Sequence, residues 1–142
     1  VALCLGLSAQ PSWPEWAQRA HTQGLAVSHV FAPSYAQPRA GSRVAVIGGG
    51  ITAGQLALRL ISEQACRVTL LSRHPLRAHE FDADPGWMGP KYLAAFHATA
   101  DLTKRRQLIR MARQRGTMPH EVLRSVNGAA ASGSLTLSIG SV

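Results

Sequence analysis

Hydrophobic positions are densest between residues 43 and 71, and their spacing changes from that of a strand to that of a helix and back. Residues 43–47 and 67–71 are short runs rich in β-branched side chains, which predict two buried strands. Between them, apolar side chains recur at helical spacing and predict one apolar helix face, formed by Ala53, Leu56, Ala57, Leu60 and Ile61. Strand, glycine turn, helix and strand within so short a stretch predict a βαβ unit with parallel strands and a right-handed crossover.

The residues before this unit predict three weaker elements. Residues 1–5 are an apolar run that is followed by a glycine, which is typical of a buried strand. The stretch from Ser12 to Glu15 has the form of a capping box, and it predicts a helix from about Trp13 to Thr22 that closes at Gly24. Residues 28–31 predict a short extended segment, after which prolines and a glycine interrupt regular structure.

The residues after the unit predict a loop over 72–90, followed by helices and a strand. We expect helices over residues 91–98, over residues 102–115 with Asp101 as N-cap, and from about residue 117, with Pro119 in the first turn and a stop at Asn127 and Gly128. Alternation over residues 135–139 predicts a third strand. Together these elements predict an α/β fold: a Rossmann-like parallel sheet with helices on both faces.

Composition and charge narrow the class of protein. The 142 residues, with a net charge of +8, suffice for one ordinary domain, and their glycines and prolines follow no period, which excludes collagen-like and low-complexity classes. No apolar run approaches the roughly 18 residues of a membrane span. The chain opens at Val1 without a secretory signal and has strand-like runs near both ends. We therefore expect an incomplete piece of a longer cytoplasmic protein.

The two cysteines, Cys4 and Cys66, form neither a C-x-x-C motif nor a Cys/His metal-ligand pattern. Zinc and dithiol redox chemistry therefore have no support. A disulfide between the two cysteines stays open, although two reduced thiols in the cytoplasm are the favoured interpretation.

The clearest chemical signal is the stretch Gly48 to Ala53, which fits the dinucleotide-binding pattern G-x-G-x-x-G/A at the start of the central helix. Gly48 permits a tight turn, Gly50 lets the backbone approach a pyrophosphate, and Ala53 lets helix and strand pack closely. The pyrophosphate would lie on backbone amides at the positive end of the helix dipole. A glycine turn without a ligand is the less favoured reading here, so we predict a cofactor-binding loop formed by Gly48, Gly49, Gly50, Ile51, Thr52 and Ala53.

The end of the second strand indicates which dinucleotide binds. A site that prefers NADH usually places a carboxylate there to bond the ribose 2′-hydroxyl, whereas this chain has Ser72, Arg73 and, close behind, Arg77. A guanidinium and a hydroxyl suit a 2′-phosphate that a carboxylate would repel. The sequence therefore predicts that NADPH is preferred over NADH. For Arg77 alone, a solvated loop charge is an equally good interpretation.

Several segments resemble flavoproteins that bind two dinucleotides. Val1–Gly6 is similar to the linker that precedes their nicotinamide-nucleotide domain. Ser28–His29 and then Gly41–Gly50 follow the order seen in flavin-containing monooxygenases and lysine/ornithine N-hydroxylases, and the similarity covers most of residues 1–125. The stretch from Phe81 to Lys91 is also similar to a segment of this broad group. The glycine motif and the following strand are the specific part of the resemblance.

The resemblance implies an FAD-dependent oxidoreductase, plausibly of monooxygenase type, in which NADPH reduces the flavin. It further implies that residues 1–40 are a linker strand, short helix and connection from the flavin-domain side, and that residues 41–142 are a truncated NAD(P)H-binding domain. FAD would be held by the remainder of the protein's own chain, and the small-molecule substrate stays unidentified. A pyridine-nucleotide-binding sensor or interaction module without catalysis is the alternative.

Two charged segments carry weaker signals. His79, Glu80, Asp82 and Asp84 are close enough in sequence to raise a metal site, although a solvated acidic loop that pairs with arginines is favoured, and no metal is predicted. A functional version would place this loop beside the nicotinamide or flavin, with Trp87 as an aromatic wall. Residues 101–115 carry +5 of the net charge of +8, on Lys104, Arg105, Arg106, Arg110, Arg113 and Arg115, offset by Asp101.

This basic run is expected to be a solvated helix packed on the sheet through Leu102, Leu108, Ile109 and Ala112, because it lacks interleaved aromatic residues and any nucleic-acid-binding module. Neither nucleic acid nor membrane is predicted as a partner. No nucleophile with a neighbouring base is evident, and His29 and His97 are expected to be structural. Catalytic residues are therefore left unassigned, as is common where cofactors carry the chemistry.

Overall fold

A computed structural model describes residues 11–141 of the chain. These residues form two compact units, one that ends at Gln37 and one that spans Pro38–Ser141. Each unit is described by itself. The strand expected over residues 1–5 lies outside the described residues, and so does Cys4. Cys66 is a buried free thiol whose Sγ lies 3.6 Å from the carbonyl oxygen of Arg39.

Within residues 11–37, the first unit contains one helix, α1 (Glu15–Thr22). The predicted capping box is wrong: Pro14 is the N-cap, and no side chain caps the helix. Because the helix starts at Glu15, Ser12 lies too far from its first turn to accept a hydrogen bond from it. The predicted end is confirmed, since Gly24 has a φ of +75° and its amide bonds back to His21. Residues 28–31 form irregular structure and a turn in place of the expected extended segment.

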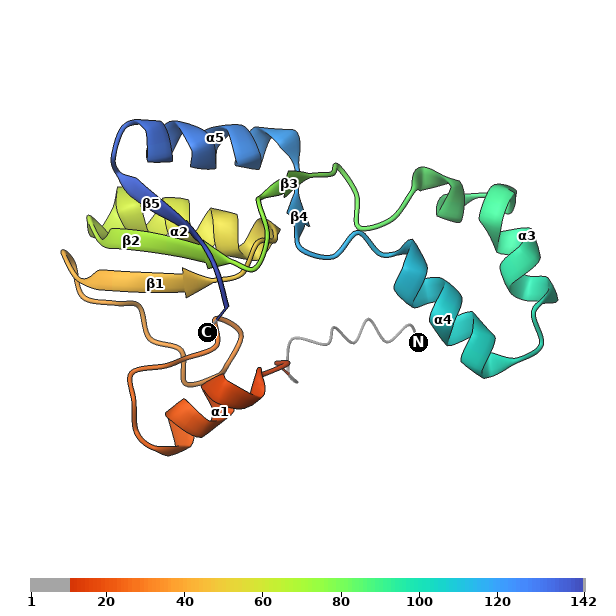
Figure 1. Cartoon of the computed structure of the whole chain (residues 1–142), viewed down its shortest axis with the longest axis horizontal. Helices are drawn as coiled ribbons and strands as arrows, with labels where there is room; N and C mark the ends of the chain where they lie inside the picture. Colours follow the sequence, from red (N-terminus) through yellow and green to blue (C-terminus); the bar gives the residue numbers. More distant parts are fainter. Residues whose placement is uncertain (1–10, 142) are drawn as a thin grey trace, which may run out of the picture. The chain divides into compact units, whose positions relative to one another are not determined.

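The second unit is built on a parallel sheet of three strands in the order β1 (Arg43–Ile47), β2 (Arg67–Ser72) and β5 (Leu135–Ile139). Val44 pairs with Val68, which in turn pairs with Leu135. The chain passes from β1 to β2 through α2 (Ile51–Gln64), so the predicted βαβ unit with parallel strands is confirmed (Figure 1). The α/β class and the parallel sheet are confirmed with it.

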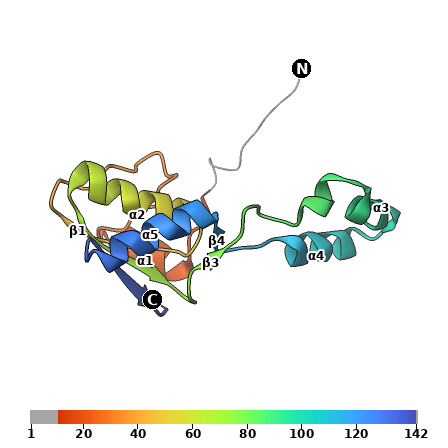
Figure 2. The ribbon, with the colours of Figure 1, turned by 90° about the horizontal axis from the view of Figure 1, so that it is seen from above.

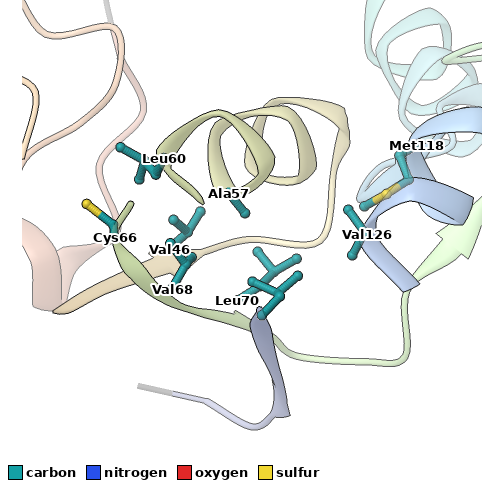
Figure 3. Packing of buried hydrophobic residues seen from close by; sticks show 9 residues of the cluster. Val46, Ala57, Leu60, Cys66, Val68, Leu70, Met118 and Val126 are labelled. Carbon is teal, nitrogen blue, oxygen red and sulfur yellow. The ribbon is translucent and has the colours of Figure 1, made fainter. Parts of the chain in front are cut away.

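One face of the sheet holds the hydrophobic core. Helices α2 and α5 (His120–Ala131) lie side by side on this face and bury Ala57, Leu60 and Val126 (Figure 1). Beneath them are the strand residues Val46, Val68, Leu70 and Leu135, and Met118 closes the cluster (Figure 3). The sequence predicted helices on both faces of the sheet. Within residues 38–141, both helices that pack on the sheet, α2 and α5, lie on the same face.

Residues 72–90, which were expected to be a loop, contain two short elements: strand β3 (Arg77–Ala78) and the 3-10 helix η2 (Pro85–Met88). Strand β3 pairs in parallel with β4 (Thr117–Met118), so that Arg77 lies opposite Thr117. Figure 2 shows these two strands side by side where the chain leaves toward α3 (Pro90–Ala98) and returns from α4 (Leu102–Ala112). A two-residue pairing has too little sequence to show a strand pattern.

Two helix ends differ from the prediction. Asp101 is confirmed as the N-cap of α4, since its carboxylate accepts from the amides of Thr103 and Lys104, but the helix ends at Ala112 and not at residue 115. The predicted stop of α5 at Asn127 and Gly128 is wrong, because both residues lie inside the helix. The helix ends instead before Gly133, which has a φ of +76°. Among the described residues, no helix is long and apolar enough to cross a membrane.

Candidate functional site

The turn between β1 and α2 is the first part of the candidate site. Gly48 has a φ of +143°, a conformation that side chains disfavour, and its amide donates to the carbonyl oxygen of Leu71, 2.9 Å away. A Cβ on Gly48 would lie 3.3 Å from that of Ala53. The turn is therefore held against the end of β2, and its backbone conformation at Gly48 would be strained for any residue with a side chain.

The next two glycines leave their backbone close to neighbouring segments. A Cβ on Gly49 would lie 3.3 Å from the Cβ of Ser72 and 3.6 Å from the carbonyl oxygen of Gly116. Gly50 is the N-cap of α2, and neither a side-chain cap nor an acidic residue occupies the first turn of that helix. The first amides of this helix have no partner within the helix, so they can donate to an anion, which the helix dipole would also favour.

A further glycine, which the sequence motif did not single out, packs closely against α5 and β4. Gly54 is buried, and a Cβ on it would lie 3.0 Å from Cγ1 of Val122 and 3.2 Å from Sδ of Met118. The close packing that the motif assigns to Ala53 is therefore shared by Gly54, which lets α2 approach α5 and β4. A glycine inside a predicted apolar helix is the signal that would have indicated it.

Ser72 and Arg73 differ in how free they are to meet a ligand. Ser72 is buried, and its hydroxyl donates to the carbonyl oxygen of His74 at 2.7 Å, so its only proton is already used within the loop. Arg73 is exposed, and within residues 11–141 no hydrogen bond or ion pair occupies its guanidinium. Of the two, Arg73 has the donors available for an incoming phosphate.

Arg77 makes defined contacts and is more than a solvated loop charge. Its Nη2 donates to the carbonyl oxygen of Arg115 at 3.0 Å and lies 3.3 Å from Nε2 of His74. Arg115 is 38 residues from Arg77 in the sequence, and the β3–β4 pairing brings the two together. The structure thus places Arg77 between the loop that follows β2 and the loop that precedes β4.

The carboxylates of the acidic segment bond to backbone amides and to an arginine. Glu80 accepts from the amide of His120 at the start of α5, Asp84 accepts from the amide of Gly86 in η2, and Asp82 pairs with Arg113 at 3.2 Å. In the part of the chain that the structure describes, no group of three or more His, Cys, Asp or Glu side chains is arranged to hold a metal ion. The favoured interpretation, an acidic loop that pairs with an arginine, describes these contacts.

Trp87 belongs to an aromatic cluster formed by η2 and α3. Its ring lies 5.5 Å from that of Tyr92 and 6.0 Å from that of Phe96. The ammonium of Lys91 lies over the ring of Tyr92. The pKa of Lys91 is raised, first by a hydrogen bond and electrostatic interaction with Tyr92 and then by the charge of Asp84. These contacts give Trp87 a packing role within its own segment.

The basic run is divided between partnered and exposed side chains. Arg105 donates to the carbonyl oxygens of His97 and Thr99, which caps the C-terminal end of α3. The prediction that this helix packs on the sheet is wrong: none of the residues of α4 is buried, and Leu102 and Ile109 are exposed. The helix lies in the segment between β3 and β4, which leaves the sheet, so its apolar side has no sheet to cover (Figure 2).

Comparison with known proteins agrees with the fold and gives the family. A comparison with curated proteins finds no match. A solved structure, ornithine hydroxylase (PvdA) from Pseudomonas aeruginosa, is similar over 70% of this chain and 27% of that chain, with 16% identity and a TM-score of 0.50. At this identity the likeness concerns the fold, and the chain spans only about a quarter of that hydroxylase.

The family comparison covers more of the chain. Residues 1–127 match the model of the L-lysine 6-monooxygenase/L-ornithine 5-monooxygenase family, a group of FAD- and NADPH-dependent enzymes. This match spans the glycine turn, the loop after β2 and the start of α5, and it confirms the resemblance to lysine/ornithine N-hydroxylases. The chain therefore belongs to the L-lysine 6-monooxygenase/L-ornithine 5-monooxygenase family of flavoprotein oxidoreductases.

Proposed function

We propose that residues 38–141 bind NADPH as part of an FAD-dependent monooxygenase. The observation that supports this most directly is the turn at residues 48–50, where three glycines bring bare backbone to the uncapped start of α2. A dinucleotide pyrophosphate has the charge and size for such a turn. The family description further favours a lysine- or ornithine-like amino acid as the substrate, oxidised on its side-chain amine.

In this proposal the residues of the turn and of the following loop act by binding and orientation. The amides of Gly49 to Ala53 donate to the pyrophosphate, and Arg73 pairs with the 2′-phosphate of the adenosine. Ser72 holds the loop through its bond to His74, which changes its expected role from ligand to support. When bound, NADPH supplies a hydride for the flavin; the protein contributes the position and charge that make this transfer selective.

FAD and the remaining substrate contacts are assigned to the rest of the enzyme. The chain contains the glycine pattern of residues 48–53 and offers no second copy of it. A yellow, flavin-containing protein purified from the intact gene would support the oxidoreductase over a module that binds pyridine nucleotide without catalysis. That the protein is located in the cytoplasm stays a prediction.

The decisive experiment compares NADPH and NADH binding to the wild-type chain and to Arg73→Ala by calorimetry. We expect Arg73→Ala to weaken NADPH binding by about tenfold, or roughly 1.4 kcal/mol, because a charge-assisted contact to the 2′-phosphate is lost. NADH binding should be unchanged, since NADH lacks that phosphate.

The control is Arg124→Ala, which removes another exposed arginine, from α5. This variant should bind NADPH as the wild type does. Equal or tighter binding of NADH by the wild type would contradict the assignment of Arg73. A folded chain that binds neither dinucleotide would contradict the proposed function.

A further inference from the structure

Two loops meet beside the glycine turn although they are far apart in sequence. One follows β2 and contains His74; the other precedes β4 and contains Arg115 and Gly116. A Cβ on Gly49 would lie 3.6 Å from the carbonyl oxygen of Gly116 and 3.7 Å from Cε1 of His74. Both loops therefore line the same side of the turn that is proposed to hold the pyrophosphate.

The hydrogen bonds of His74 and Arg77 join these loops. Nδ1 of His74 lies 2.9 Å from the carbonyl oxygen of Pro75, an acceptor, so Nδ1 carries the proton and Nε2 is left as an acceptor. Nη2 of Arg77 donates to this Nε2 at 3.3 Å and to the carbonyl oxygen of Arg115 at 3.0 Å. We call these two hydrogen bonds the Arg77 bridge.

The loop that contains Gly116 is held on both sides of that glycine, and the ion pair between Asp82 and Arg113 lies on the side before it. Gly116 has a φ of +69°, and a Cβ on it would lie 3.3 Å from Nε2 of His74. Its neighbour Thr117 belongs to β4, which pairs with β3 over two residues only. The bridge adds a side-chain connection to this short pairing and fixes the approach of Gly116 to the turn.

We propose that Arg77 is a positioning residue for the dinucleotide: the Arg77 bridge holds the Arg115–Thr117 backbone against the glycine turn, and Arg77 does not itself bind the 2′-phosphate. This inference rests on the proposed function. It divides the work of the two arginines after β2. Arg73 distinguishes NADPH from NADH, whereas Arg77 shapes a wall that both dinucleotides share.

The test measures NADPH and NADH affinity for the full chain carrying Arg77→Ala, Arg77→Lys or Gly116→Ala. Arg77→Ala should weaken the binding of both dinucleotides by the same factor, about tenfold, because a displaced Arg115–Thr117 backbone affects the pyrophosphate that both contain. Arg77→Lys keeps one charged donor and should recover part of the loss. Gly116→Ala should repeat the equal loss by pushing against His74. Arg124→Ala serves again as the control.

A second measurement needs no dinucleotide and separates this inference from the proposed function. Two amides beside the bridge are hydrogen-bonded, those of His79 and Gln114, which donate to the carbonyl oxygens of Met118 and Asp82. Their hydrogen exchange should be faster in Arg77→Ala than in Arg124→Ala, with an unchanged urea midpoint. A loss confined to NADPH, as for Arg73→Ala, would overturn the positioning role, and so would unchanged exchange and affinity. If the wild type binds neither dinucleotide while exchange still accelerates, the proposed function fails and the Arg77 bridge remains.

Discussion

Individual glycines in this fold serve distinct physical purposes. Gly48 is required for its positive φ and Gly54 for the approach of another helix. A Cβ on Gly49 would press on the Cβ of Ser72, whereas one on Gly50 would make only ordinary contacts. Gly128, by contrast, lies inside α5 with no atom within 4 Å of the position where a Cβ would be. Replacing each by alanine therefore measures a different property.

We predict that Gly54→Ala lowers the free energy of unfolding by about 1 kcal/mol. Overpacking against Val122 and the buried Met118 costs roughly 1–3 kcal/mol, which outweighs the gain in helix propensity of at most about 1 kcal/mol. The matched variant Gly128→Ala should raise stability by about 0.5–1 kcal/mol, because it gains propensity without a clash. Urea unfolding followed by circular dichroism checks both; stabilisation of equal size in the two variants would contradict the packing argument.

For single residues, the sequence predicts where the candidate site lies better than it predicts the hydrogen-bond partners of the side chains there. The motif and its context locate the turn at residues 48–53, because glycine spacing and the following helix are local features. Whether Ser72 offers its hydroxyl to a ligand depends on a carbonyl two residues away, and the partner of Arg77 lies at Arg115. Such contacts depend on loop conformation and tertiary pairing, which no local pattern contains.

Among the elements, α4 differs from the core helices because its own ends and neighbours stabilise it. It has no buried residue, its first turn is capped by Asp101, and Arg105 ties it to the C-terminal end of α3. An exposed helix of this length is marginal without such contacts. Its stability should therefore be local and separable from that of the sheet.

We predict that Asp101→Ala destabilises α4 by about 1 kcal/mol, which should speed amide exchange in this helix about fivefold. The urea midpoint of the whole chain should hardly change, since no side chain of α4 lies in the core. Asp101→Asn keeps an oxygen acceptor and is the control, with near-normal exchange. A large fall in the global midpoint with Asp101→Ala would show that α4 supports the core after all.

The elements that the sequence predicts best are those with long patterns. β1, α2 and β2 follow from β-branched runs and from apolar residues at helical spacing, and α4 follows from its N-cap. Errors occur where a local motif competes with tertiary contacts. Asn127 and Gly128 form a typical stop signal, yet α5 continues through them because Val126 is fully buried beside them and Gly133 supplies the turn.

For the whole molecule, stability within residues 38–141 is concentrated on one face of one sheet. Burial also varies within this face, and Leu70 and Leu137 allow the comparison because they are direct partners on β2 and β5. Leu70 is fully buried beneath α2 and α5, whereas Leu137 is 40% exposed. The two leucines offer the same side chain in the same sheet at different depths.

We predict that Leu70→Ala lowers the free energy of unfolding by about 2–5 kcal/mol, through lost burial and the cavity that remains. Leu137→Ala should cost at most about 1 kcal/mol, because much of its side chain already meets solvent. Urea denaturation of the two variants checks the difference. Losses of equal size would contradict the difference in burial between these two positions.

The β3–β4 pairing also has a consequence for how the family can vary. It brings Ala78 and Met118 together, so the segment between them departs from and returns to one place beside the sheet. Insertions, deletions or sequence changes within residues 79–116 therefore need not alter the register of β1, β2 and β5. A chimera that exchanges only the part from η2 to α4 and keeps Arg115 and Gly116 would therefore retain both the sheet and the Arg77 bridge while acquiring another enzyme's helices.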